Sequence, residues 1–463
     1  MSKKSISVFV LTMMNLATIL SIKNWPFAAE YGFSSMFYIL LAVLTFFIPS
    51  ALVSAELATG WPEQGGIFVW VRQALGRKMA FLAVWLLWVE NVVWYPTILS
   101  FIAGTIAYAI DPTLTNSSTF NFLMVLSIFW GVTLLNLRGI RISGIVSTLG
   151  VLLGTLAPGI LIVGLGINWY ISGHPTQIPI DSESFFPKID SIYELVFLSG
   201  VILSFTGIEM NAVHANDVDK PQRSYPIAIL ASVLMIVLFT SLGTLAIAMV
   251  IPKNEISLTA GSVAAIDHFL SAYGLGKLIP TICVLISFGA LAALSTWIIG
   301  PSTGLLTAAK SGDLPPMLRT VTKSGTPLGM LLLQGFIVSL LSLVFFVMPS
   351  VSSSFWMMTA MTSQLYLMMY LLLFISALVL KFRQPDVHRT FKVPGGKVGM
   401  SLVCFLGIVS SIFCFVVGFF PPSQLDMGGV VRYEIIQFSG VFAFFIAPFI
   451  ILALKKPHWE TKE

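Results

Sequence analysis

The chain has 463 residues, of which 57% are hydrophobic and only 10% are charged, and its mean hydropathy is +0.93. So few charged residues cannot cover the surface of a water-soluble globule of this size, which excludes a soluble enzyme or binding domain. The composition therefore predicts an integral membrane protein.

Apolar runs long enough to cross a bilayer, which takes about 20 residues, recur along the whole sequence. The first follows the short basic N-terminus and lacks a small-residue cleavage site, so we expect an uncleaved span rather than a signal peptide. In chain order, twelve spans are expected at about residues 7–30, 35–55, 80–110, 120–137, 145–171, 192–213, 226–251, 278–309, 329–348, 354–380, 400–420 and 434–454.

Lysine and arginine are distributed unevenly between the two sides of the membrane. If both termini are cytoplasmic, all 25 cations lie in inner segments except Lys23, in the first span, and four outer-loop residues, Lys188, Lys253, Lys277 and Arg432. Cationic loops stay in the cytoplasm. The sequence therefore predicts a multi-pass protein of the cell (inner) membrane with both termini cytoplasmic, and the net charge of +5 gives no indication of nucleic-acid binding.

Three ionisable residues fall deep inside apolar runs: Lys23 in span one, Glu90 in span three and Glu209 in span six. A charge at mid-bilayer costs at least about 2.5–3.5 kcal/mol, so such a residue normally faces the protein interior and marks a substrate or ion pathway. The alternative is a buried ion pair, such as Lys23 with Glu90, that only joins helices.

Polar residues interrupt two of the spans. In span one the interruption is "SIKNWPFAA", from Ser21 to Ala29, and in span six it is "SFTGIEMNAVHAND", from Ser204 to Asp217. Two broken helices five spans apart predict one transporter domain, residues 1–463, built as an inverted repeat of about 7–171 and about 192–380, with extra helices at about 400–454. The alternative for span one is a simple kink at Pro26.

In transporters of this kind the backbone groups freed at the breaks, together with the helix-end dipoles, hold a charged substrate at the midplane. Irregular backbone survives at that depth only where it lines a cavity. We therefore expect the two breaks to bind the substrate. The expected substrate-binding residues there are Ser21, Ile22, Lys23, Asn24, Trp25, Phe205, Thr206 and Gly207.

Several motifs carry a family resemblance. They are "GFSSMFYILLAVLTFFIPSALVSAELATGWPEQGGIFVWVRQALG", "SFTGIEMNAVHANDVDKPQRSYPIA", "IPKNEISLTAG", "STWIIGPSTG" and "HRTFKVPGGK". In this order the sequence resembles the amino acid, polyamine and organocation (APC) transporter superfamily, and within it the bacterial glutamate/GABA antiporter family. The resemblance, from about residue 7 to about 455, implies an all-α, LeuT-like 5+5 inverted repeat with broken helices 1 and 6 plus two C-terminal helices. It also implies exchange of an amino acid for a related amino acid or its decarboxylated amine.

The resemblance assigns further site residues. It implies a coupling and gating role for Glu209, and places Trp297 of span eight and Tyr366 and Tyr370 of span ten in the walls of the pocket. The two tyrosines are four residues apart and so share one helix face. Without the resemblance, both would be read as packing residues.

The chain departs from the family in the pocket. Lys23 stands where the glutamate/GABA antiporter has a tyrosine, Ala293 where it has a glutamate, and Glu90 where it has a glutamine. A cation there suits a substrate carboxylate, so Lys23 is also a candidate for coupling, and Glu90 suits a substrate amine. The identity of the substrate is therefore not predicted.

The coupling ion is also left open. Thr148 stands where sodium-independent members have a basic residue, and with Ser295 and Thr296 it forms a weak candidate sodium site, although helix packing explains these hydroxyls better. The alternative function is therefore a proton- or sodium-coupled amino acid symporter, while a channel or a membrane-embedded enzyme has less support. No metal or cofactor is expected, and no C-terminal plug for acid gating. The expected partners are the amino acid substrate and the lipid bilayer. The expected oligomeric state is a monomer or a homodimer.

Overall fold

The computed structural model describes residues 6–63, 65–139, 144–212, 221–310, 312–456 and 459. Twelve helical segments of this described part are long and apolar enough to cross a membrane, which confirms the predicted all-α, twelve-span architecture. The spans are Val8–Ala29, Gly32–Gly60, Arg77–Ile110, Ser118–Leu137, Thr148–Ile171, Ile192–Asn211, Ser224–Val250, Gly276–Lys310, Leu328–Val347, Val351–Arg383, Gly396–Val417 and Val430–Ala453.

Several spans consist of more than one helix, and short helices lie between spans. The α-helices are α1 Val8–Ile19, α2 Trp25–Ala29, α3 Ser35–Ala42, α4 Ile48–Gly60, α5 Ile67–Leu75, α6 Arg77–Ile110, α7 Ser118–Leu137, α8 Gly144–Val151, α9 Ala157–Ile171, α10 Ser182–Phe185, α11 Phe197–Leu203, α12 Ile208–Ala212, α13 Pro221–Val250, α14 Gly261–Ala272, α15 Ile279–Lys310, α16 Leu328–Leu341, α17 Val344–Val347, α18 Val351–Arg383, α19 Gly396–Val417 and α20 Val430–Ala453.

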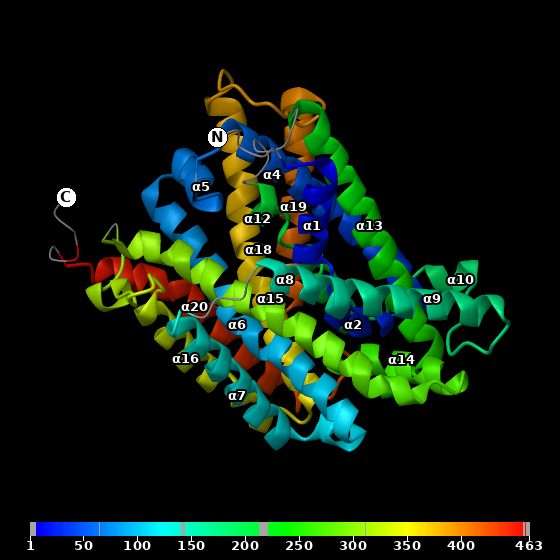
Figure 1. Cartoon of the computed structure of the whole chain (residues 1–463). Helices are drawn as coiled ribbons and strands as arrows, with labels where there is room; N and C mark the ends of the chain where they lie inside the picture. Colours follow the sequence, from blue (N-terminus) through cyan, green and yellow to red (C-terminus); the bar gives the residue numbers. More distant parts are fainter. Residues whose placement is uncertain are drawn as a thin grey trace.

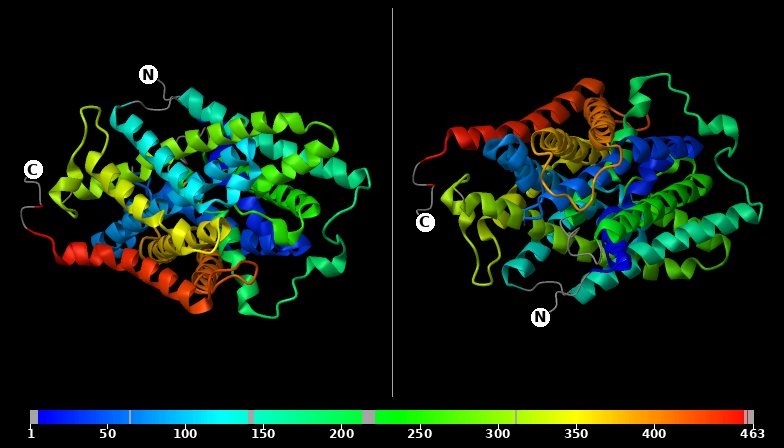
Figure 2. Two further views of the ribbon diagram at one scale, coloured as in Figure 1. Left: turned by 90° about the horizontal axis from the view of Figure 1, so that it is seen from below. Right: turned by 90° about the horizontal axis from the view of Figure 1, so that it is seen from above.

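The spans form one bundle with buried helices at its centre and lipid-facing helices at its edge (Figure 1). In the most apolar window of α6, 72% of the residues are buried inside the protein, compared with 17% for α20. Both views of Figure 2 show α20, in red, along the outside of the bundle. The central helices therefore build the site, whereas α20 faces the lipid.

The span-one break, Leu20–Ser21, is shorter than the polar stretch that predicts it. α1 ends at Ile19, the next two residues have extended backbone with ψ of 118° at both, and the chain re-enters helical geometry in a 3₁₀ turn, Ile22–Asn24. Pro26 lies in the first turn of α2, where its missing N–H costs nothing. The alternative of a kink at Pro26 is therefore wrong: the proline starts the second half of the span.

The span-six break runs over residues 204–207. α11 ends at Leu203, and α12 begins at Ile208 after Gly207, whose φ is +103°. That conformation is accessible to glycine and strained for other residues. A Cβ at Gly207 would also come within 3.3 Å of Thr18, in the last turns of α1. Both predicted breaks are confirmed, and glycine lets the second one approach span one closely.

Small residues bring span eight against span five. A Cβ on Gly154 would lie only 2.4 Å from the Cα of Gly289, so both positions require glycine for this backbone approach. Close packing through small residues is a common way for membrane helices to associate. The contact holds α15, which carries Trp297, against span five.

A buried ionic cluster joins span two to span ten and to the segment after it. The Glu56 carboxylate accepts hydrogen bonds from Lys381 Nζ at 2.7 and 3.0 Å and from the backbone N–H of Val393 at 2.7 Å, and Arg389 Nε lies 3.3 Å from it. The side chains of Glu56, Lys381 and Arg389 are at most 8% exposed. We call Glu56, Lys381, Arg389 and Val393 the inner clamp, since the positive-inside rule predicts a cytoplasmic location for these ends.

Candidate functional site

A small internal cavity lies between the two breaks, with a volume of about 90 Å³. This volume is far below the 300–1,000 Å³ typical of drug-sized ligands. The structure therefore holds a narrow polar site at the centre of the bundle. Its lining residues are Thr18, Ile19, Ser21, Lys23, Asn24, Glu90, Asn91, Trp94, Leu203, Thr206, Gly207, Trp297, Thr362 and Tyr366.

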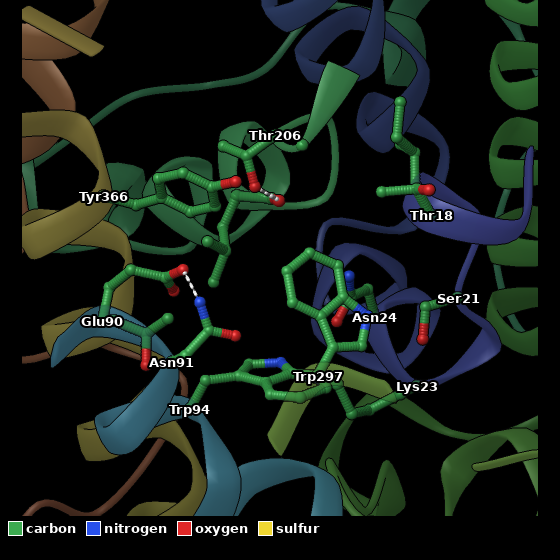
Figure 3. A pocket seen from close by; sticks show the side chains of 14 residues that line it. Thr18, Ser21, Lys23, Asn24, Glu90, Asn91, Trp94, Thr206, Trp297 and Tyr366 are labelled. Carbon is green, nitrogen blue, oxygen red and sulfur yellow. Dashed lines mark hydrogen bonds between the residues drawn. The ribbon is translucent and has the colours of Figure 1, made fainter. Parts of the chain in front are cut away.

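Spans one, three, six, eight and ten all contribute predicted residues to this cavity. Figure 3 shows Glu90 and Tyr366 on one side, Ser21 and Lys23 on the other, and the Trp297 ring between them. Bringing together residues more than 300 positions apart requires the packing of the whole bundle. The predicted residues that line the cavity are Ser21, Lys23, Asn24, Glu90, Thr206, Gly207, Trp297 and Tyr366.

Three residues predicted at the breaks lie outside the cavity lining. The carbonyl of Ile22 accepts a hydrogen bond of 2.7 Å from the Ser262 hydroxyl on α14. The ring of Trp25 packs on α13 so closely that a Cβ on Gly243 would be 2.3 Å from it. Phe205 stacks on Phe47 of span two with ring centroids 5.2 Å apart. These contacts hold the two breaks against neighbouring helices.

Lys23 is buried without a carboxylate partner among the described residues. Its side chain is 2% exposed, its Nζ lies 3.5 Å from Thr97 Oγ1, and the ammonium is 5.2 Å from the ring centroid of Phe355 and 5.9 Å from that of Trp94. Aromatic faces attract cations, but they do not neutralise the charge. The Nζ of Lys23 is therefore placed to bind an anionic group.

Glu90, which is 3% exposed, lies in α6 and accepts a hydrogen bond from the side-chain amide of Asn91 (Figure 3). No ion pair joins it to Lys23 within the part of the chain that the structure describes, so the alternative of a Lys23–Glu90 pair that only joins helices is wrong. A cation and a carboxylate that do not neutralise each other can act on the two charged ends of one bound molecule.

Glu209 lies behind the cavity, one residue after the start of α12, and is held by both predicted tyrosines. The hydroxyl of Tyr366 donates to Glu209 Oε1 at 2.7 Å, and the hydroxyl of Tyr370 donates to Oε2. Tyr370 also accepts a hydrogen bond of 2.8 Å from the backbone N–H of Gly207. Because both carboxylate oxygens act as acceptors, the geometry fits the ionised carboxylate. Tyr366 lines the cavity, whereas Tyr370 links Glu209 to the span-six break.

Sequence reasoning missed six lining residues: Thr18, Ile19, Asn91, Trp94, Leu203 and Thr362. Helical spacing could have found Trp94, because it lies four residues after Glu90 and therefore on the same face. The same spacing could have found Thr362, which lies four residues before Tyr366 on α18. The other four gave no such signal, since they are ordinary residues of membrane spans.

The candidate sodium site remains a prediction. Thr148 is exposed on α8 and Ser295 is 5% exposed within α15, while the side chain of Thr296 lies outside the described residues.

Comparison with known proteins agrees with this architecture. The family model described as "Amino acid permease" matches residues 2–445. An uncharacterized transporter of Legionella pneumophila is 41% identical over 97% of each chain. A glutamate/gamma-aminobutyrate antiporter of Lactococcus lactis is 32% identical over 100% of this chain and 93% of its own length. A probable agmatine/putrescine antiporter of the same species is 23% identical over 91% of this chain. The chain therefore belongs to the amino acid permease family of membrane transporters.

Proposed function

We propose that this protein is an amino acid antiporter that works by alternating access, exchanging an amino acid for a related amino acid or its decarboxylated amine. Two relatives named glutamate/gamma-aminobutyrate antiporters, each matched over 100% of this chain and 93% of its own length, support exchange. The observation that carries the proposal is the cavity lined by both broken spans. On one wall stands Lys23, which has no carboxylate partner among the described residues, and on the other stands the carboxylate of Glu90.

The backbone at the breaks suits the two charged groups of an amino acid. The last carbonyl groups of α1 have no intrahelical partner and lie at the negative end of the helix dipole, which favours an ammonium group. The 3₁₀ turn at Ile22–Asn24 begins directly after the break. Its first N–H groups have no acceptor within the turn, so they favour a carboxylate. Carbonyl groups on one side of the break and N–H groups on the other support binding of the α-amino and α-carboxylate groups at the span-one break.

Lys23 and Glu90 then select the rest of the substrate. In this proposal Lys23 attracts a side-chain carboxylate and Glu90 attracts an amine, so that an acidic amino acid and its amine product use opposite walls. Trp297 separates the two walls in Figure 3 and supplies the surface that closes over the substrate.

Glu209 couples and gates transport in this proposal. Protonation of its carboxylate would turn one acceptor oxygen into a donor, and one of the two tyrosine contacts would be lost. Because Tyr370 also accepts from Gly207, loss of the Tyr370 contact would loosen the span-six break itself. A chemical change at one carboxylate would thereby bias the movement of two helices, as a two-state gate requires.

The same proposal includes the arrangement in the membrane. We infer two inverted repeats, at about 7–171 and about 192–380, two extra C-terminal helices, cytoplasmic termini and a location in the cell (inner) membrane. The distribution of lysine and arginine supports this orientation. A transporter rather than an enzyme fits the family, and the functional unit is a monomer or a homodimer.

Liposomes test the exchange directly. Purified protein is reconstituted in vesicles that are empty or preloaded with one of a panel of amino acids and amines, and uptake of labelled glutamate and γ-aminobutyrate is measured with and without sodium and proton gradients. Uptake only into preloaded vesicles is expected. Uptake into empty vesicles that follows an ion gradient would overturn the proposal and establish the symporter alternative.

Two matched variants then test the roles of Lys23 and Glu90 in substrate selection. Lys23→Gln and Glu90→Gln each remove one buried charge and keep a polar side chain of similar length. Lys23→Gln should raise the KM for substrates with a second carboxylate more than for their amines, and Glu90→Gln should do the reverse. Equal effects of both variants on every substrate would contradict these roles.

A further inference from the structure

A second polar cleft lies outside the substrate site, where the ends of three spans meet. It has a volume of about 490 Å³ and is lined by Arg77 and Lys78 at the start of α6, Asp313 shortly after α15, Lys455 shortly after α20, and the rings of Phe81 and Phe449. We call it the basic cleft. None of its lining residues lines the cavity between the two breaks.

One buried carboxylate holds two of the cations in place. Asp313 Oδ1 lies 2.9 Å from Arg77 Nη2 and 3.5 Å from Lys455 Nζ, and Asp313 Oδ2 lies 3.3 Å from Arg77 Nε. The side chain of Asp313 is 5% exposed, whereas that of Arg77 is 54% exposed. A buried anchor thus fixes the cations and leaves the guanidinium accessible, which reduces the entropy lost when it binds an anion.

The lining of the basic cleft has more positive than negative charge. Among the described residues of its lining, Arg77, Lys78 and Lys455 carry positive charge and Asp313 carries negative charge. Arg77 is also the first residue of α6, a 34-residue helix, so the positive end of the helix dipole points into the same region. The arrangement favours a ligand with a negative charge and several acceptor oxygens, the chemistry of a phosphate group.

The position of the basic cleft favours a phosphate carried by a lipid. Its cations lie at the ends of membrane spans, on the side that the positive-inside rule predicts to be cytoplasmic. Phe449, in its wall, is 39% exposed, and the next exposed residues of α20 include Ile446 at 42%. Figure 2 shows α20 on the outside of the bundle. Apolar surface for an acyl chain therefore begins directly beside the cations.

We propose that the basic cleft binds the phosphate headgroup of an anionic phospholipid from the cytoplasmic leaflet, with Arg77, Lys78 and Lys455 on the phosphate and an acyl chain along α20. Basic pockets between helices on this side of a membrane suit such headgroups. The bound lipid would connect α20, which is the least buried span, to α6 at the centre of the bundle.

Lipid retention by the full-length protein tests this site. The purified chain in detergent is titrated with phosphatidylglycerol or phosphatidylcholine, and bound lipid is counted by native mass spectrometry. The test variant is Lys78→Gln with Lys455→Gln, which leaves the Arg77–Asp313 pair intact. The control is Lys392→Gln with Lys456→Gln, which removes the same charge at two exposed lysines outside the cleft.

The wild type and the control should retain phosphatidylglycerol in preference to phosphatidylcholine. Each cation near an anionic lipid contributes about fivefold to binding, so the test variant should bind phosphatidylglycerol about 30-fold more weakly. Equal retention by test and control variants, or equal retention of the two lipids by the wild type, would overturn the proposal.

A competition with inorganic phosphate distinguishes a lipid headgroup from free phosphate as the ligand of the basic cleft. If free phosphate at millimolar concentration displaces phosphatidylglycerol from the wild type, the site is one for a soluble anion and the lipid assignment is wrong. If it does not, the acyl chain is part of the ligand. Should the double variant fail to run as a single species in size exclusion, Lys78→Gln alone is measured, with an expected loss of about fivefold.

Discussion

Replacing Tyr370 by phenylalanine removes a single oxygen that joins the span-six break to Glu209. This hydroxyl accepts from the backbone N–H of Gly207 at 2.8 Å and donates to Glu209 Oε2. The hydroxyl of Tyr366, four residues earlier on α18, bonds to Glu209 Oε1 at 2.7 Å and makes no other hydrogen bond among the described residues. Tyr366→Phe is therefore a matched control that differs by one backbone contact.

The hydrogen bonds give the expected magnitudes. A hydrogen bond to a charged group contributes about 1.5–3 kcal/mol to the free energy of unfolding, and this is the expected cost of Tyr366→Phe. Tyr370→Phe loses a similar bond and also leaves the Gly207 N–H without its acceptor, which costs about 1–3 kcal/mol more when the donor is buried. The expected total for Tyr370→Phe is thus about 2.5–6 kcal/mol.

Thermal unfolding of the two purified variants measures the difference. For a chain of this size, each kcal/mol lost from the free energy of unfolding lowers the melting temperature by about 2 °C or less. Tyr370→Phe should therefore melt a few degrees below Tyr366→Phe. Exchange in liposomes should also be slower for Tyr370→Phe, because the break it holds lines the cavity. Equal melting temperatures for the two variants would refute the reasoning that Tyr370 fixes the span-six break.

Three further outcomes are expected. Glu209→Gln should stay folded, because its amide oxygen keeps one tyrosine contact, but should lose coupled exchange; wild-type pH dependence of exchange would contradict its role. Glu56→Gln removes the carboxylate of the inner clamp and should lower the free energy of unfolding by about 3–5 kcal/mol, whereas Glu63→Gln, in an exposed pair with Arg72, should cost about 1 kcal/mol or less; similar melting temperatures would refute this contrast. Burial raises the pKa of Glu30, just after α2, to about 8 from an ordinary value of 4.5. Between these two pH values the folded state holds a proton that the unfolded chain releases, so the free energy of unfolding should fall as the pH rises from about 4.5 to about 8. Glu30→Gln should lack that fall, and parallel melting-temperature profiles for variant and wild type would argue against it.

The number of spans and the two breaks could be predicted because they depend on local chemistry. Runs of about 20 apolar residues are required to cross the bilayer, and the polar stretches after Leu20 and Leu203 cannot continue a lipid-facing helix without internal partners. Pro26 belongs to the polar stretch that predicted the first break, and it starts α2 after that break instead of kinking a continuous helix. Gly207 was expected at the second break, and its φ of +103° gives the physical reason.

The direction in which each side chain points was decided by packing. Membrane spans are apolar on all sides, so the sequence pattern of a span does not indicate which face meets a cavity. Within one short stretch, Ser21, Lys23 and Asn24 line the cavity, while the ring of Trp25 packs against Gly243 of α13.

The sequence by itself determined that this chain lies in a membrane, crosses it twelve times and carries three charges too costly to leave in lipid. Only the tertiary structure decided what those charges contact. Lys23 and Glu90 were candidates for a mutual ion pair, and packing instead turns Lys23 toward Trp94 and Phe355 and Glu90 toward Asn91. The physical reason is that hydrophobicity and helix breaks are properties of neighbouring residues. The residues that contact Lys23 and Glu209, in contrast, come from helices far apart in the chain and depend on how those helices rotate as they pack.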